Sequence, residues 1–126
     1  MSEEQRKYRR VALTVEDGYF GTFHLGNEKT LVAPILSLSA GGLQFALPKA
    51  KEDQIEEGQR IHLKQLSGTV QLNFLSDLNV EVRWKRPGET PEYLSVGCEI
   101  IDLSDSLRDQ VIKFVDSERK VRGQYR

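Results

Sequence analysis

Several features that would place a protein in a class are missing from this sequence. A single cysteine, Cys98, cannot form an internal disulfide, so the chain is not a disulfide-stabilised secreted scaffold and a reducing, cytoplasmic setting is favoured. No apolar run approaches the roughly 18 residues of a membrane span. The polar residues 1–5 contain no apolar segment of a signal peptide. We therefore expect a soluble protein that is not exported.

The sequence also lacks an excess of charge of either sign. Its 18 Lys and Arg residues stand against 19 Asp and Glu residues, which gives a formal net charge of −1. A surface that attracts DNA or RNA over its whole extent needs a basic excess. General nucleic-acid binding is therefore disfavoured, and any anion site must be local.

Motifs for catalysis and metal binding are absent as well. No nucleophile, base and orienting acid form a recognisable pattern, and no Gly-rich loop leads into a phosphate-binding Lys. His24 and His62 have no second metal ligand at a suitable spacing, so we interpret them as ordinary strand residues. We predict a protein that is not an enzyme and that holds no metal or cofactor.

What the sequence does contain is a series of short segments in which apolar and polar residues alternate. Over residues 11–15, Val11, Leu13 and Val15 are the apolar members, a period of two that is typical of half-buried strands. Further strands are predicted at 19–25, 31–37, 43–47, 60–66, 69–75, 80–85 and 93–101, with glycine-containing breaks between them. Many short strands with close turns predict a mainly β fold, an antiparallel barrel or sandwich, with a short helical turn at 49–57.

The periodicity changes after residue 101. Ser104 is placed to cap a helix, and the apolar residues that follow are spaced by three and four, which makes one stripe along it: Leu107, Val111, Phe114 and Val115. We predict this helix over about 104–120 and expect the basic run beyond residue 118 to fray. The first ten residues are almost wholly polar, so we predict an arm over 1–10 and one domain over 11–122.

Two strand residues could be taken for functional ones. Trp84 alternates with Val80 and Val82, so we predict that it packs in the core or the barrel wall and is not a platform for bases. Cys98 lies between two apolar residues of the same strand face, which indicates a buried structural thiol and not a nucleophile.

Arginines of the arm are the first candidates for a binding site. Arg6 and Arg10 are four residues apart, which puts both side chains on one side of the arm whether it is helical or extended. A guanidinium offers a planar fork of donors to a phosphate or to the O6 and N7 edge of guanine, and it can stack on a base. In a strand-like arm Arg9 would point away from these two residues, and it could add a phosphate contact. Taken alone, the arginines are better explained as a solvated basic arm.

A second group of candidates stands where a predicted strand ends. Ser37 and Ser39 lie two residues apart, and therefore on one face of the strand, and Gly41 and Gly42 follow them. The hydroxyls can hydrogen-bond to a base or a phosphate, and glycine permits positive φ and close approach of the main chain. Taken alone, this group is explained as a strand that ends in a turn.

Together, in this order, the two groups resemble the double signature of the PilZ domain family, RxxxR followed by (D/N)xSxxG. Arg6 and Arg10 match the first motif, Ser39 and Gly42 match the second, and Ser37 stands where the family has Asp or Asn. Residues 42–45, 57–61 and 96–104 are also similar to strands and turns of the family. The resemblance therefore covers nearly the whole chain.

The resemblance implies an antiparallel barrel of six or seven strands with a C-terminal helix, which binds cyclic di-GMP on its outside while the arm folds over the ligand. Arg6 and Arg10 would contact phosphate and guanine, and Ser39 with the backbone near Gly42 would hold the other base. Ser37 offers less than Asp or Asn, so we expect binding roughly five- to tenfold weaker than with the family's residue. The residue before the arm motif, Gln5, would influence whether one ligand or an intercalated pair binds.

The resemblance further implies a cytoplasmic receptor, monomeric or homodimeric, that couples the second messenger to a partner protein. The family is associated with motility, surface attachment, exopolysaccharide production and virulence, and the sequence does not choose among them. The alternative is a PilZ-like interaction module that does not bind cyclic di-GMP, and Ser37 keeps this alternative open. A small barrel that binds nucleic acid in general is a third interpretation, against which the near-neutral charge counts.

Overall fold

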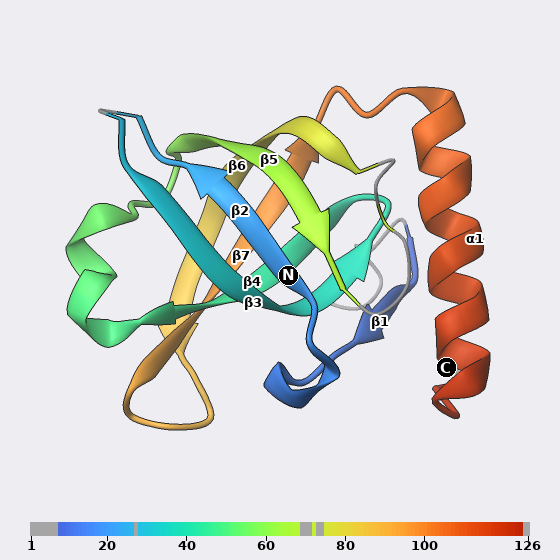
Figure 1. The fold of residues 1–126 in the computed structure, drawn as a ribbon, viewed down its shortest axis with the longest axis horizontal. Coiled ribbons are helices and arrows are strands. Elements are labelled where there is room, and N and C mark those ends of the chain that lie inside the picture. Colours follow the sequence, from blue (N-terminus) through green and yellow to red (C-terminus); the bar gives the residue numbers. More distant parts are fainter. Residues whose placement is uncertain (1–7, 27, 69–71, 73–74, 125–126) are drawn as a thin grey trace.

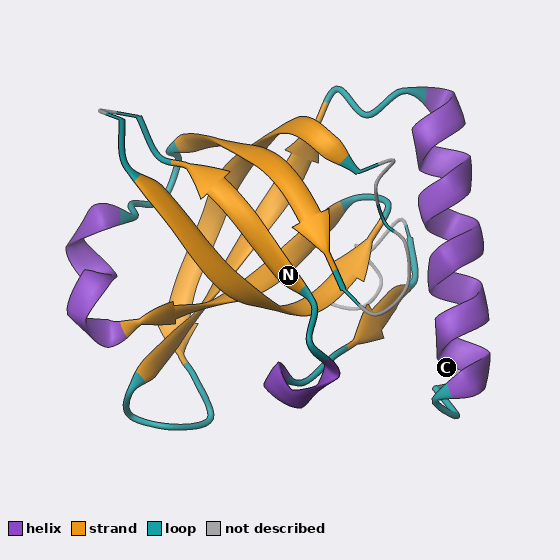
Figure 2. Cartoon of the chain, viewed as in Figure 1, coloured by secondary structure: helices purple, strands orange, loops and turns teal. Residues whose placement is uncertain are grey.

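The computed structural model describes residues 8–26, 28–68, 72 and 75–124. In these residues seven strands precede a single α-helix, as Figures 1 and 2 show. The elements are β1 (Arg10–Ala12), β2 (Phe20–His24), β3 (Thr30–Ser39), β4 (Gly42–Pro48), β5 (Arg60–Ser67), β6 (Ser76–Pro87), β7 (Tyr93–Ile101) and α1 (Asp105–Val121). Two short 3-10 turns, η2 (Val15–Asp17) and η3 (Lys49–Gln54), lie between strands.

The strands form one closed antiparallel barrel. Their order is β1-β3-β2-β5-β6-β7-β4, and β4 also pairs with β3, so six strands close on themselves. Strand β1 is an addition, paired with β3 beyond the residues where β2 pairs with it. The predicted fold class, an antiparallel barrel with a C-terminal helix, is confirmed.

Apolar side chains of alternate strand residues fill the barrel. The rings of Phe23 and Phe45 meet there with their centroids 4.6 Å apart. Leu63, Val80 and Val82 lie in the same cluster, each fully buried. Complete burial of side chains of this size stabilises the fold by roughly 1.5–3 kcal/mol each. Polar residues lie mainly on the outer face.

The first strand is shorter than predicted. Val11 and Leu13 are buried as expected, but the period of two ends there, because the chain enters the turn η2 and leaves Val15 48% exposed. A local cap explains the turn. The Asp17 carboxylate accepts hydrogen bonds from the Thr14 N–H at 2.7 Å and from the Thr14 hydroxyl at 3.2 Å. Side-chain hydrogen bonds of this kind compete with the strand.

Other predicted strand boundaries shift by a few residues. Strand β3 continues to Ser39, and β6 already begins at Ser76. The strand predicted at 69–75 falls mostly outside the described residues; Leu72 and Leu75 are described, and both are buried outside any strand. The short helical turn predicted at 49–57 is present as η3.

Trp84 belongs to the barrel wall and lies on its outer side. The pairing of β6 with β7 is irregular between Val82 and Trp84, so the alternation that points Val82 inward does not extend to the indole. The ring instead covers Gly97, where an added Cβ would lie 2.1 Å from it. The guanidinium of Arg86 stacks over the indole at 4.3 Å from the ring centroid.

Helix α1 lies along one side of the barrel, next to β1 (Figure 1). Ser104 caps it as predicted, with its Oγ accepting a hydrogen bond from the Leu107 N–H at 3.2 Å. Val111 and Val115 are buried against the barrel, and the ring of Phe114 meets Tyr19 edge-on at 6.2 Å. In the described part of the chain, no helix is long and apolar enough to cross a membrane.

Candidate functional site

Strands β1 and β3 bring the two predicted groups of residues together. In their antiparallel register Arg10 lies opposite Ser39, and Ala12 lies opposite Ser37. The pair between them, Val11 and Leu38, is buried in the core. Because neighbouring residues of a strand point to opposite faces, Arg10 and Ser39 project from the outer face of the barrel.

The backbone of β1 makes this pairing a close one. The Arg10 carbonyl accepts a hydrogen bond from Arg119 Nη1 at 2.7 Å, and both backbone polar groups of Ala12 bond to Gln124. These groups therefore point away from β3. Antiparallel pairs of this kind have their Cα atoms about 4.5 Å apart and their side chains closest. Arg10 and Ser39 are thus neighbours on one surface.

Ser39 also shapes the turn that follows it. Its Oγ accepts hydrogen bonds from the N–H groups of Gly41 and Gly42, both at 3.1 Å, and its hydroxyl lies 3.4 Å from the Gly42 carbonyl, which it can donate to. The Gly41 carbonyl in turn accepts from the Ile100 N–H at 3.0 Å. The predicted turn is present, and the hydroxyl proposed for a ligand is engaged in holding it.

Gly42 is required by a close approach of two strands. Neither Gly41 nor Gly42 has a positive φ, so the conformational freedom of glycine is not used at this turn. A Cβ on Gly42 would lie only 2.3 Å from the Cys98 carbonyl oxygen on β7. A Cβ on Gly41 would lie 3.3 Å from the ring of Tyr8, a side chain that can move more easily than the backbone.

Ser37 occupies a covered position. It lies on the same strand face as Ser39, as predicted, but it is only 6% exposed. It is one of two polar residues, with Arg119, that are buried in the described part of the chain. A ligand on the outer surface would meet Ser39 and Arg10 before it met this hydroxyl.

The remaining predicted residues belong to the arm. Arg6 lies outside the described residues. Arg9 is described and exposed, and it lies beside helix α1 and not beside Ser39. Tyr8, whose role the sequence did not indicate, packs against Gly41 and so connects the arm to the glycine turn.

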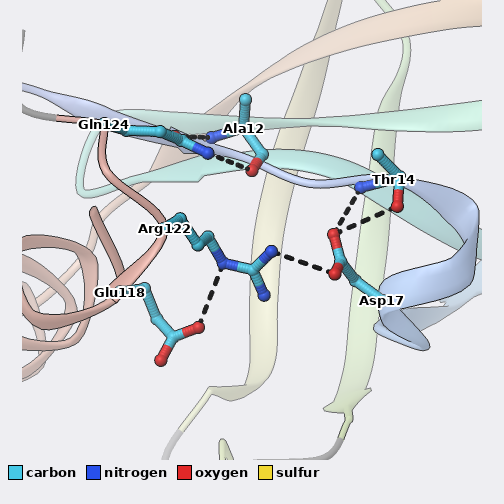
Figure 3. A network of polar contacts seen from close by, with 6 residues as sticks. All are labelled: Ala12, Thr14, Asp17, Glu118, Arg122 and Gln124. Atoms are coloured by element: carbon cyan, nitrogen blue, oxygen red, sulfur yellow. Dashed lines mark hydrogen bonds and ion pairs between the residues drawn. The ribbon is translucent and has the colours of Figure 1, made fainter. Parts of the chain in front are cut away.

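The end of helix α1 holds β1 in place, which the sequence did not predict. The expected fraying beyond residue 118 is wrong for the described residues, since Arg119 is 7% exposed and Arg122 and Gln124 have defined partners. Arg122 lies 2.9 Å from the Asp17 carboxylate and 3.2 Å from that of Glu118 (Figure 3). Arg119 Nη2 is buried and has no hydrogen-bond partner among the described residues.

Asp17 contacts both Arg122, after the end of α1, and Thr14, after β1. The hydrogen bond from the Thr14 backbone and then that from Arg122 lower the pKa of Asp17 below its ordinary value. Its carboxylate therefore stays ionised over a wider pH range and keeps both partners. The path Thr14–Asp17–Arg122 joins the segment after β1 to the end of α1.

Cys98 and His62 have defined surroundings in the structure. Cys98 is 7% exposed, and burial raises the pKa of its thiol to about 12, so the prediction of a buried structural cysteine is confirmed. His62 lies 3.1 Å from Asp77 and 3.4 Å from Asn79. No group of three or more potential ligands in the described part is arranged to hold a metal ion.

Comparison with known proteins finds a matching domain family and solved structures with a similar fold. A family model described as PilZ domain matches residues 4–117. No curated protein sequence gives a match. The family match spans both motifs and the barrel, and it ends inside helix α1.

Solved structures with the same fold include several described with cyclic di-GMP. The PilZ domain of YcgR from Escherichia coli, with c-di-GMP, superposes with a TM-score of 0.69 at 21% identity, over 95% of this chain and 96% of that domain. The MrkH–c-di-GMP complex of K. pneumonia gives 0.66 at 14% identity, over 92% of this chain and 55% of that one. Bacillus subtilis MotI/DgrA gives 0.66 at 13%, over 91% and 51%.

These similarities establish a shared fold at low sequence identity. The chain spans nearly all of the isolated YcgR domain but only about half of longer chains, 49% in the case of complete YcgR with c-di-GMP. The common part is the barrel with its helix.

Proposed function

This chain belongs to the PilZ domain family, and from that premise we propose that it is a receptor for cyclic di-GMP. The observation that carries the proposal is the register of β1 and β3, which sets Arg10 beside Ser39 on the outer face of the barrel. An arginine, a hydroxyl and a glycine turn then share one surface, next to the arm that contains Arg6.

The ligand's chemistry fits these groups. Cyclic di-GMP has two phosphates and two guanines, so it offers anionic oxygens, base edges with several acceptors and flat faces for stacking. The Arg10 guanidinium can serve a phosphate or the O6 and N7 edge of guanine. The turn at Gly41 and Gly42 has no side chains to keep a base away from the main chain. Arg6 would supply the second guanidinium from the same side of the arm.

The proposed mechanism couples ligand to the arm and hence to α1. Binding would draw the arm toward the ligand through Arg6, and β1 is attached to α1 through Arg119 and to the residues after α1 through Gln124. A change in the arm would therefore alter the surface formed by β1 and α1. A partner protein that reads this surface would transmit the signal to motility, attachment or exopolysaccharide production.

One observation favours a second function. Ser37 replaces the family's Asp or Asn, and it is 6% exposed, so the position provides little contact to an external ligand. A module that acts through protein contacts alone, without cyclic di-GMP, would tolerate this residue. The two functions differ in whether the chain binds cyclic di-GMP, which can be measured.

Calorimetric titration with cyclic di-GMP tests the proposal. We expect micromolar binding by the wild-type chain and its loss in Arg6→Ala and in Arg10→Ala. Arg60→Ala is the matched control, because Arg60 is an exposed arginine on β5 that pairs with Glu81 on β6, away from the glycine turn. Absence of heat at high micromolar ligand would support the interaction module, and salt-sensitive binding of any single-stranded DNA would support a nucleic-acid binder.

A further inference from the structure

A hollow lies between the arm and helix α1, on the side of β1 away from β3. It is lined by Tyr8 and Arg9 of the arm and by Ile112, Val115 and Asp116 of the helix. Its volume is about 200 Å³. Sites that enclose a whole drug-sized ligand measure roughly 300–1,000 Å³, so this hollow is suited to a fragment such as one flat base.

The hollow combines apolar walls with two charged groups. Ile112 and the buried Val115 form an aliphatic surface, and Tyr8 adds an aromatic ring. Such surfaces take a base by its faces, since every base has a π-system that stacks on aromatic and aliphatic groups. The charges at its rim, Arg9 and Asp116, are both on exposed side chains and are free to adjust to a ligand.

The two charged groups are complementary to guanine. A carboxylate accepts only, and the Watson–Crick edge of guanine presents the donors N1–H and N2–H₂ side by side. A guanidinium donates only, and guanine presents the acceptors O6 and N7 on its other edge. Adenine offers an acceptor at N1 where guanine offers a donor, so a carboxylate would face a lone pair there. The pair Asp116 and Arg9 therefore favours guanine.

Tyr8 connects the hollow to the glycine turn. It lines the hollow and also packs against Gly41. The arm and β1 run parallel to the helix, because residues 8–9 meet residues 112–116, Arg10 meets Arg119 and Ala12 meets Gln124. The seven steps along the helix from Ile112 to Arg119 cover about 10 Å at 1.5 Å per residue. That length is comparable with the dimensions of a dinucleotide.

We propose that this hollow is a guanine subsite, in which Asp116 reads the donor edge of one base of cyclic di-GMP and Tyr8 lies against that base. The proposal rests on the proposed function and extends it to the helix, which neither signature motif includes. Asp116 would be a specificity-determining residue that separates guanine from adenine nucleotides.

The negative charge of Asp116 makes the test unambiguous in sign. Cyclic di-GMP is a dianion, so a carboxylate that merely stands near it repels it, and removal of that charge tightens binding. A carboxylate that accepts hydrogen bonds from guanine has the opposite effect, because its removal leaves the base donors unpaired. The two roles therefore predict changes in opposite directions.

The experiment titrates the full chain, Asp116→Ala and Asp109→Ala with cyclic di-GMP and with cyclic di-AMP by calorimetry. Asp109 is the matched control, because it is an exposed aspartate of the same helix that does not line the hollow. We expect Asp116→Ala to bind cyclic di-GMP roughly tenfold more weakly and to lose much of its preference over cyclic di-AMP. Asp109→Ala should match the wild type in both.

The outcomes separate the subsite from the proposed function. If the wild type binds cyclic di-GMP and Asp116→Ala binds it equally well or more tightly, the subsite is wrong and the receptor function stands. If the wild type does not bind cyclic di-GMP, both are wrong. Unfolding of each variant in urea accompanies the titration, and equal midpoints assign the affinity change to the site.

Discussion

The side-chain amide of Gln124 pairs with the backbone of Ala12 as a neighbouring strand would. Its Oε1 accepts from the Ala12 N–H at 2.9 Å, and its Nε2 donates to the Ala12 carbonyl at 3.0 Å (Figure 3). Gly123, with a φ of 70°, makes the turn that directs Gln124 toward β1. The free edge of β1 is thereby satisfied by a residue 112 positions away.

Gln124→Ala should loosen β1 specifically. The substitution removes two hydrogen bonds, so we expect the free energy of unfolding to fall by about 1 kcal/mol. Amide hydrogen exchange followed by NMR should show faster exchange at Ala12 than in the wild type. Gln110→Ala, an exposed glutamine of the same helix, is the control. Equal protection of the Ala12 amide in both variants would contradict this role of Gln124.

Gly42→Ala should destabilise the barrel more than Gly41→Ala. The new Cβ at position 42 would meet the Cys98 carbonyl at 2.3 Å, and this backbone contact is relieved only by moving a strand. At position 41 the neighbour is the ring of Tyr8 at 3.3 Å, which can shift. We expect a loss of about 1–3 kcal/mol for Gly42→Ala in urea unfolding. If Gly41→Ala lowers the free energy of unfolding more than Gly42→Ala does, Gly42 is not the position where the two strands come closest.

Cys98 should be unreactive in the folded chain, and the titration of its thiol should affect stability only in alkali. Burial raises the pKa of its thiol from 9.0 to about 12. The unfolded chain releases this proton first, so its stabilising contribution is complete below about pH 9 and is lost as the pH rises toward 12. A disulfide reagent at pH 8 should label it slowly in buffer and rapidly in urea.

The control for this prediction is Cys98→Ala. Between pH 9 and 11 its free energy of unfolding should fall less steeply than that of the wild type, because other titrating groups are common to both. Equal labelling rates in buffer and in urea would show that the thiol is not buried.

Ser37→Asp should change stability and affinity in opposite directions. A carboxylate at a position that is 6% exposed loses hydration, so we expect the ligand-free variant to be less stable by about 1–3 kcal/mol. An acceptor for a guanine edge is gained, and we expect cyclic di-GMP to bind about five- to tenfold more tightly. Thermal unfolding with and without ligand measures both, and unchanged affinity would remove Ser37 from the ligand surface.

Local rules predicted most of the fold, and they failed where a distant or competing contact intervenes. The alternation of Val11 and Leu13 identified β1, but the Asp17 cap turns the chain before Val15. Trp84 packs in the barrel wall as predicted, but the sequence did not show that it lies on the outer side, because the irregularity in the pairing with β7 is not visible in its own strand. Such irregularities depend on two strands, and alternation within one strand describes only one.

The candidate site was predicted in part. The two motifs were expected to share one site, and Arg10 of the first does lie opposite Ser39 of the second. The contacts of Arg119, Arg122 and Gln124 were not predicted, because their partners lie about a hundred residues upstream. A basic C-terminal run carries no sign of such partners, so it resembled a frayed end. The engagement of the Ser39 hydroxyl with the following glycine N–H groups is a local turn, and its spacing of two and three residues could have indicated it.

The central claim is that β1 and β3 with the glycine turn form one nucleotide site, and chemical-shift mapping by NMR tests it most directly. The labelled full chain is titrated with cyclic di-GMP and the backbone amides are followed. The account predicts the largest shifts at Arg10, Ser39, Gly41 and Gly42, with little change at Arg60 on the distant strand β5. No shifts, or shifts centred on β5 and β6, would contradict it.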